Sequence, residues 1–207
     1  MDFTKNDFKT GDIILYHSTC WYSKLIEFFT GSQYSHCSMI LKDPTYIDPK
    51  LQGLYVIESA AEEICVDSES NKNVFGVQII PLEKVLQEYS IKNNGNLYWR
   101  KLNCNRDDKF IQKIKEVHQL VHHKPYDLNP LDWMKGLFNI EIGEVQKKNT
   151  FWCSALLGYI YSYLGLLPDT LPWSLISPSQ FSSESKVLQF QNCILEKDTY
   201  IDCQKLL

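Results

Sequence analysis

Short apolar runs bounded by turn-forming residues recur in the first half of the chain, and this pattern predicts β-strands. Four such runs, rich in apolar, β-branched and aromatic residues, cover 12–16, 36–42, 54–59 and 75–80. A fifth covers 96–102. Two Asp-Pro pairs and Gly53 lie between the second run and the third, so we expect these two strands to form an antiparallel hairpin.

Four other segments are predicted to be helical. The clearest is 106–123, whose apolar residues share one face and whose Asp107 and Asp108 lie at the end where the helix dipole is positive. The other three are 20–31, 82–90 after Pro81, and a segment that follows Thr150 and ends at Gly165. The tail, 186–196, is predicted to form a last strand.

The order of these elements favours an α+β fold with an antiparallel sheet packed against helices, because the strands are grouped and do not alternate with helices. The chain has 207 residues, 44% of them hydrophobic and 22% charged, which is typical of a globular protein with a real core. Repeats and Pro/Gly-rich linkers are absent, so we predict one domain over 1–207. The mixed segment 127–149 could form a lid or an insertion within it, although its apolar residues fit a helix packed on the core better.

Charge and targeting signals narrow the classes of function. The net charge of -4 and the lack of a basic stripe argue against a nucleic-acid partner. No signal-peptide pattern and no apolar run of the roughly 20 residues needed to span a bilayer is found. The seven cysteines are an odd number without C-x-x-C spacing, which favours free thiols in a reducing compartment. We therefore expect a cytoplasmic protein that needs no cofactor.

Cys153 stands at the start of the predicted C-terminal helix. With Thr150 as the N-cap, Cys153 would be the third residue of the first turn, where free backbone N–H groups and the helix dipole favour a thiolate. Phe151 and Trp152 beside it would exclude water. Its position alone fits an inert thiol on the apolar face of a buried helix somewhat better than a reactive thiol.

Among the five histidines, His36 has the clearest potential partner. If the hairpin loop is centred near residue 47, the simplest antiparallel register places His36 opposite Glu58. A carboxylate beside an imidazole fixes its tautomer and stabilises its charged form. The residues themselves fit a structural ion pair as well as a catalytic one.

Three further histidines, at positions 118, 122 and 123, lie on the last turns of the 106–123 helix. We expect them to be solvated and to cap the terminal carbonyl groups. His118 and His122 have the i, i+4 spacing of a shared metal site, but Gln119 occupies the position where zinc metalloproteases have Glu. The sequence therefore predicts no metal.

Six sequence blocks occur in an order that resembles the circularly permuted papain-like hydrolases of the YiiX type. These hydrolases are relatives of the NlpC-type peptidases and of lecithin:retinol acyltransferase. The match runs from Gly11 to about Pro178, and its blocks are GDIILYHS, YSHCSMIL, YVIESA, PLEKV, KPYD and FWCSALLGYIYSYLGLLP. The resemblance implies a permuted papain-like fold of the NlpC type, with the nucleophile at the N-terminus of a C-terminal helix. In papain the nucleophile comes before the histidine.

Carried over residue by residue, the resemblance implies Cys153 as the nucleophile, His36 as the general base and acid, and Glu58 as the group that orients His36. Tyr126, in KPYD, corresponds to a tyrosine that helps to stabilise the oxyanion in NlpC-type enzymes. The backbone N–H of Cys153 is the second expected oxyanion donor. The neighbours of the nucleophile and the base, Trp152 and Ser35, complete the expected substrate-binding set.

The predicted function is cysteine-dependent acyl hydrolysis through a thioester acyl-enzyme, by an amidase, a peptidase or a lipid-type hydrolase. Two alternatives stay open: an acyltransferase of the lecithin:retinol acyltransferase type, and a non-catalytic module that binds a lipid or a protein. Retention of Cys153, His36 and Glu58 together argues against the binding module. The expected partner is an acyl-containing substrate. Exposed apolar surface on 127–149 or on 20–31 would favour peripheral contact with a membrane, and the sequence does not determine the oligomeric state.

Overall fold

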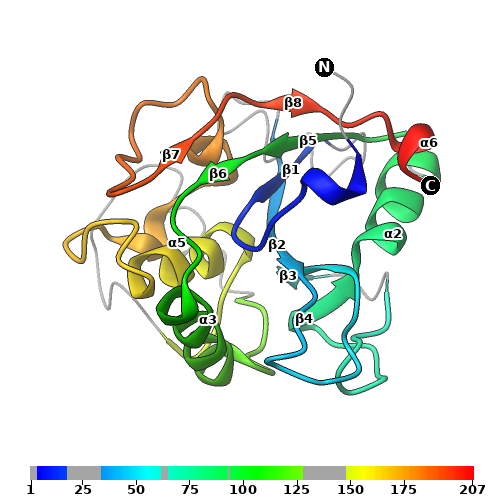
Figure 1. Cartoon of the computed structure of the whole chain (residues 1–207), viewed down its shortest axis with the longest axis horizontal. Helices are drawn as coiled ribbons and strands as arrows, with labels where there is room; N and C mark the ends of the chain where they lie inside the picture. The colour runs from blue at the N-terminus through cyan, green and yellow to red at the C-terminus, as the bar shows by residue number, and fades with distance from the viewer. Residues whose placement is uncertain (1–3, 18–33, 62–64, 93, 128–147) are drawn as a thin grey trace.

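The computed structural model describes residues 4–17, 34–61, 65–92, 94–127 and 148–207 (Figure 1). The helix predicted over 20–31 and residues 128–147 of the predicted lid or insertion lie outside these ranges. Within them, none of the helices is both long and apolar enough to cross a bilayer. The six cysteines of the described residues are free thiols.

A six-stranded antiparallel sheet with the order β4-β3-β2-β1-β5-β8 forms the centre of the fold. Its strands, in chain order, are β1 (Ile13–His17), β2 (His36–Lys42), β3 (Leu54–Ala60), β4 (Gly76–Pro81), β5 (Asn96–Arg100) and β8 (Thr199–Tyr200). The α+β class and the five strands predicted in the first half are therefore confirmed. The edge strand β8 is too short to leave a periodic pattern in the sequence.

The tail is less regular than its pattern indicates. In place of one strand over 186–196, the structure has β7 (Ile194–Leu195), which pairs with β6 (Leu102–Asn103) in a two-stranded sheet. The run 96–102 is also divided, because β5 ends at Arg100 and β6 begins at Leu102. Short 3-10 helices complete the chain: η1 (Lys5–Asp7), η3 (Trp173–Leu175) and η4 (Pro178–Phe181).

Both faces of the sheet are covered, and successive residues of each strand point to opposite faces. One face packs on α3 (Asp108–Val121) and α5 (Cys153–Tyr163) through Ile13, Leu15, Met39, Ile57 and Ile79. The other packs on α2 (Leu82–Val85), the π-helical turn η2 (Leu86–Lys92) and α6 (Cys203–Leu206) through Ile14, Tyr16, Ile40, Val56 and Ile80. Figure 1 shows α3 and α5 together on one side, and α2 and α6 on the opposite side.

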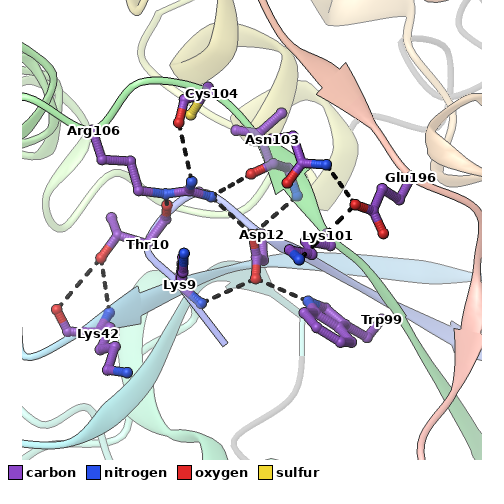
Figure 2. A network of polar contacts seen from close by, with 12 residues as sticks. Lys9, Thr10, Asp12, Lys42, Trp99, Lys101, Asn103, Cys104, Arg106 and Glu196 are labelled. Atoms are coloured by element: carbon purple, nitrogen blue, oxygen red, sulfur yellow. Dashed lines mark hydrogen bonds and ion pairs between the residues drawn. The ribbon is translucent and has the colours of Figure 1, made fainter. Parts of the chain in front are cut away.

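Buried Asp12, directly before β1, joins this strand to β5, to β6 and to the segment that leads into α3 (Figure 2). Its Oδ2 accepts hydrogen bonds from the Lys9 backbone N–H at 3.0 Å and from the Trp99 indole at 2.9 Å. Its Oδ1 accepts from the Leu102 backbone N–H and from Arg106 Nη2, both at 3.0 Å. Four donors thus compensate the buried charge.

We expect Asp12→Ala to lower the free energy of unfolding by about 3 kcal/mol or more, because it leaves three N–H groups without their acceptor and Arg106 without its carboxylate partner. Urea denaturation followed by circular dichroism measures the change. The control is Asp108→Ala, which removes an exposed carboxylate from the first turn of α3 and should cost about 1 kcal/mol or less. Equal losses in the two variants would show that the network contributes little.

Candidate active site

Helix α5 begins at Cys153, with Trp152 as its N-cap. The predicted N-cap, Thr150, was wrong: its hydroxyl donates to Asp127 Oδ2 at 3.0 Å, and the next residue, Phe151, forms a parallel bridge with Tyr126. This pairing keeps the chain extended through Trp152 (φ -88°, ψ 171°), so that the helix starts later than its capping pattern indicates. Cys153 is consequently the first residue of the helix, where its backbone N–H has no acceptor within the helix.

The segment before Cys153 is tied to the sheet through Phe151. The backbone N–H of Phe151 donates to the Pro125 carbonyl at 3.1 Å, and its carbonyl accepts from the Ser59 hydroxyl at 2.6 Å. Because Ser59 belongs to β3 and Phe151 is buried, the sulfur of Cys153 is held at a defined place beside the sheet.

His36, the first residue of β2, contacts Glu58 of β3: Nε2 of the imidazole lies 2.7 Å from Oε2 of the carboxylate. The predicted register, however, was wrong by two residues. Met39 pairs with Ile57, and continuing this register places Ser38, not His36, opposite Glu58. A shift of two residues keeps both side chains on the same face of the sheet, and long side chains can still meet along the diagonal.

Glu58 is fully buried and is held from its other side by Gln78 of β4. The Gln78 amide Nε2 donates to Glu58 Oε1 at 3.0 Å, and the two residues are direct partners in the β3–β4 register. The His36 ring in turn packs edge-on against Tyr16, with a centroid distance of 4.7 Å, and is nearly parallel to the ring of Tyr89. Both the carboxylate and the imidazole are therefore oriented by neighbours.

His36 also forms a side-chain hydrogen bond with Cys153. Since Nε2 faces Glu58, Nδ1 is the nitrogen that remains for the sulfur. Burial lowers the pKa of His36, but the negative charges of Cys153 and Glu58 outweigh it and raise this pKa to about 10. An imidazolium is thus favoured at neutral pH.

The pKa of the Cys153 thiol lies well below its ordinary value. A hydrogen bond from the Cys37 side chain lowers this pKa most, burial raises it, and the charge and hydrogen bond of His36 lower it further. These opposite shifts favour a thiolate–imidazolium pair, the form in which a cysteine is nucleophilic.

Cys37 and Gln78 are the site residues that the sequence analysis missed. Burial, followed by the interaction with Cys153, raises the pKa of Cys37 well above its ordinary value, so Cys37 remains a thiol that donates toward the Cys153 sulfur. Its backbone N–H is a further donor to Cys153. The sequence offers one signal: as the neighbour of His36 in a strand, Cys37 must point to the opposite face, which is the face that α5 covers.

The structure places the three other predicted residues near this centre, and their substrate-binding roles remain predictions. Tyr126 pairs with Phe151 and packs its ring on Phe75 at 6.0 Å between centroids. The Trp152 indole donates to the Ile176 carbonyl at 3.4 Å. The buried Ser35 donates its hydroxyl to the Tyr16 carbonyl, also at 3.4 Å.

The fold of this chain is a six-stranded antiparallel sheet covered by helices on both faces, with Cys153 at the tip of α5. In agreement, the chain resembles a solved structure, that of metalloprotein YiiX from Escherichia coli O157:H7. The TM-score is 0.52 at 17% sequence identity, and the match covers 94% of this chain and 97% of that one. The YiiX-like fold predicted from the six sequence blocks is therefore confirmed.

The amino-acid sequence is also similar to that of a viral protein. Uncharacterized protein R372 of Acanthamoeba polyphaga mimivirus is 32% identical over 136 residues, which cover 58% of this chain and 51% of that protein. The chain thus spans about half the length of this relative. No protein-family model matches the sequence.

Proposed function

We propose that this protein is a cysteine-dependent acyl hydrolase, with Cys153 as the nucleophile, His36 as the general base and acid, and Glu58 as the residue that orients His36. The observation that carries the proposal is the chain of contacts from Glu58 through His36 to Cys153, three residues that are far apart in sequence. A thiolate, a base within hydrogen-bond reach and an orienting third group are the parts that acyl transfer to sulfur requires.

In the proposed reaction the Cys153 thiolate attacks the substrate carbonyl carbon, and a C–S bond forms as the carbonyl π electrons move to oxygen. The backbone N–H of Cys153 and the Tyr126 hydroxyl stabilise this oxyanion. The His36 imidazolium then protonates the leaving group, the C–X bond breaks, and a thioester acyl-enzyme remains. Neutral His36 next accepts a proton from water, which attacks the thioester and releases the acid and the thiolate.

Amides, esters and thioesters all fit this chemistry, and we favour an amidase, a peptidase or a lipid-type acyl hydrolase. With an amine or an alcohol as the acceptor in place of water, the same acyl-enzyme would make the protein an acyltransferase. A non-catalytic lipid- or protein-binding module on this fold is the alternative outside the enzymes, and the paired pKa shifts of His36 and Cys153 argue against it.

The YiiX structure that this chain resembles is described as that of a metalloprotein, which raises the question of whether Cys153, His36 and Glu58 could bind a metal ion. His36 turns Nε2 to Glu58 and leaves Nδ1 for Cys153, so no single imidazole nitrogen faces both of the other groups. This arrangement fits proton transfer and does not fit three-point coordination of one ion. The proposed reaction therefore has no step through a metal at Cys153.

Alkylation by iodoacetamide, followed by peptide mass spectrometry, tests the proposal. We expect Cys153 to react at pH 6 within about threefold of its rate at pH 8, because it is already a thiolate at the lower pH. An ordinary thiol slows by about tenfold per pH unit below its pKa. Cys104 and Cys193 serve as internal controls: both are more exposed than Cys153, and burial raises their pKa, that of Cys193 to about 11.

His36→Ala should restore an ordinary pH dependence of Cys153 alkylation, since it removes the imidazolium that stabilises the thiolate. If Cys153 in the unmodified protein reacts no faster at pH 6 than Cys104 and Cys193, the proposed nucleophile is wrong, and the binding module becomes the better proposal.

A further inference from the structure

A second cluster of reactive side chains lies at the C-terminal end of α3, and the proposed hydrolysis does not use it. Oε2 of Glu69 is 2.9 Å from Nε2 of His118 and 3.2 Å from Nε2 of His122. One ligand atom from each residue lies within 4.8 Å of the others. Glu69 and His118 are largely buried, with side-chain exposures of 12% and 8%. The expectation of a solvated side chain is therefore wrong for His118.

One ring nitrogen of this cluster is buried without a hydrogen-bond partner. Nε2 of His118 is hydrogen-bonded to Glu69, but Nε2 of His122, although it is buried, has no hydrogen-bond partner. A buried polar atom without a hydrogen-bond partner normally indicates that a ligand, an ion or a water molecule supplies the missing contact.

The cluster is built on well-supported backbone. Asp67 holds the turn that carries Glu69: its Oδ1 accepts from the Ile79 backbone N–H at 2.9 Å, and its Oδ2 accepts from the Ser70 backbone N–H at 2.8 Å. His118 is on the last turn of α3. His122 is the C-cap residue, and its backbone N–H donates to the His118 carbonyl at 2.8 Å. The three side chains are therefore directed toward one point by rigid elements.

We propose that Glu69, His118 and His122 together bind one divalent transition-metal ion, for which Zn²⁺ is the best fit. Two imidazole nitrogens and a carboxylate oxygen are a standard ligand set for zinc, which they bind at about 2.0–2.2 Å. Two such ligands on a tetrahedral ion are about 3.3 Å apart, close to the separations of the two nitrogens from the Glu69 oxygen. The fourth position would hold water.

This site differs from the zinc metalloprotease pattern that the sequence lacks. In that pattern the Glu next to the first histidine is the general base and not a ligand, so Gln119 excludes a chemical step of that kind but does not exclude a metal. The third ligand here comes from the turn before β4, which no helix-based motif includes. The expectation of no metal rested on the helix alone.

The position of the site indicates a structural role for the ion. The residues directly after His122 lead to the Cys153 segment: the Lys124 carbonyl accepts from the Val77 N–H at 2.9 Å, and the Pro125 carbonyl accepts from the Phe151 N–H at 3.1 Å. An ion at the end of α3 would therefore tie this helix to the turn before β4, one short segment away from the nucleophile.

The test is Zn²⁺ titration of the chelator-treated, full-length protein by isothermal calorimetry. We expect one tight site, and we expect Glu69→Gln and His122→Gln each to weaken it by at least about 100-fold, since even residues that only orient metal ligands contribute 10–100-fold. Zn²⁺ should also raise the Tm of the unmodified protein and not that of these two variants. Zn²⁺ affinity and Tm do not depend on acyl turnover, so these measurements can contradict the metal site without contradicting the proposed acyl hydrolysis.

His123→Asn is the matched control. His123 stacks on His122 at 3.6 Å between centroids but is not in the cluster, and its φ of 57° is one that asparagine adopts readily. Zn²⁺ affinity should stay within about fivefold of the original in this variant. Equal weakening in His123→Asn and His122→Gln would overturn the assigned ligands.

Co²⁺ distinguishes this site from binding to a cysteine. At the proposed site the cobalt spectrum should lack the intense sulfur-to-metal charge-transfer band and should be the same in Cys153→Ser. A charge-transfer band that is present in the unmodified protein and absent in Cys153→Ser would show that Cys153 is a ligand of the ion, and it would overturn the proposal. So would Zn²⁺ binding that is no tighter in the unmodified protein than in the Glu69→Gln, His122→Gln double variant.

Discussion

Cys153→Ala is expected to abolish acyl turnover and to lower kcat by at least about 10⁴-fold, because the neighbouring thiol, Cys37, has a raised pKa and is not a thiolate at neutral pH. The measurement is a screen of peptides, lipids and thioesters with the unmodified protein, followed by the variant on any substrate that is turned over. Mass spectrometry of the quenched reaction should find the acyl group on the peptide that contains Cys153.

The control for this experiment is Cys104→Ala, which removes a thiol that is more exposed than Cys153 and whose pKa is raised by burial. Its turnover should stay within about twofold of the original. Turnover by Cys153→Ala at the original rate would rule out a cysteine mechanism at this site. A crystal of this variant with an intact ligand would identify the leaving group directly.

Glu58→Gln is expected to lower kcat by about 10²–10⁴-fold while the fold stays intact. The substitution preserves size but removes the charge that stabilises the His36 imidazolium, and it places an amide opposite both His36 and the Gln78 amide. Because the Glu58 charge is one of the causes that raise the pKa of His36 to about 10, its loss lowers this pKa. The alkaline limb of the kcat profile should therefore move to lower pH.

A pH series of kcat, with circular dichroism of the folded protein at each pH, measures both effects. Glu116→Gln is the matched control, since Glu116 also accepts a hydrogen bond, from the Tyr163 hydroxyl at 3.1 Å, but lies on α3. It should leave both kcat and the alkaline limb unchanged. An unchanged pH profile in Glu58→Gln would remove Glu58 from the mechanism.

Side-chain periodicity predicted the secondary structure well because it reflects local geometry. The bounds of β2 agree with the pattern to the residue, and the amphipathic run around α3 needs only small corrections at its ends. Asp107, one of the two acidic residues noted at the start of this run, is its N-cap and accepts from the Phe110 N–H at 2.9 Å. Such signals depend on residues within one or two turns of each other, so the sequence displays them directly.

Where the prediction went wrong, a partner distant in sequence was responsible. The start of α5 moved from Thr150 to Trp152 because Phe151 pairs with Tyr126, and no capping rule includes that bridge. The hairpin register moved by two residues, yet the contact of His36 with Glu58 survived, because an even shift conserves the face of each strand. The alternation of apolar and polar residues along a strand indicates which face of the sheet each side chain occupies. Which residues of two strands pair is set by the loop and by packing.

The sequence by itself thus determined the α+β class, the five main strands, the helical segments around α2, α3 and α5, and the candidates Cys153, His36 and Glu58. Only the tertiary structure decided which side chains complete them: Cys37 beside the Cys153 sulfur, Gln78 on Glu58, and Glu69 between His118 and His122. The physical reason is the same in each case. These contacts form between segments that packing brings together, and their geometry follows from strand order and helix placement, which no local pattern encodes.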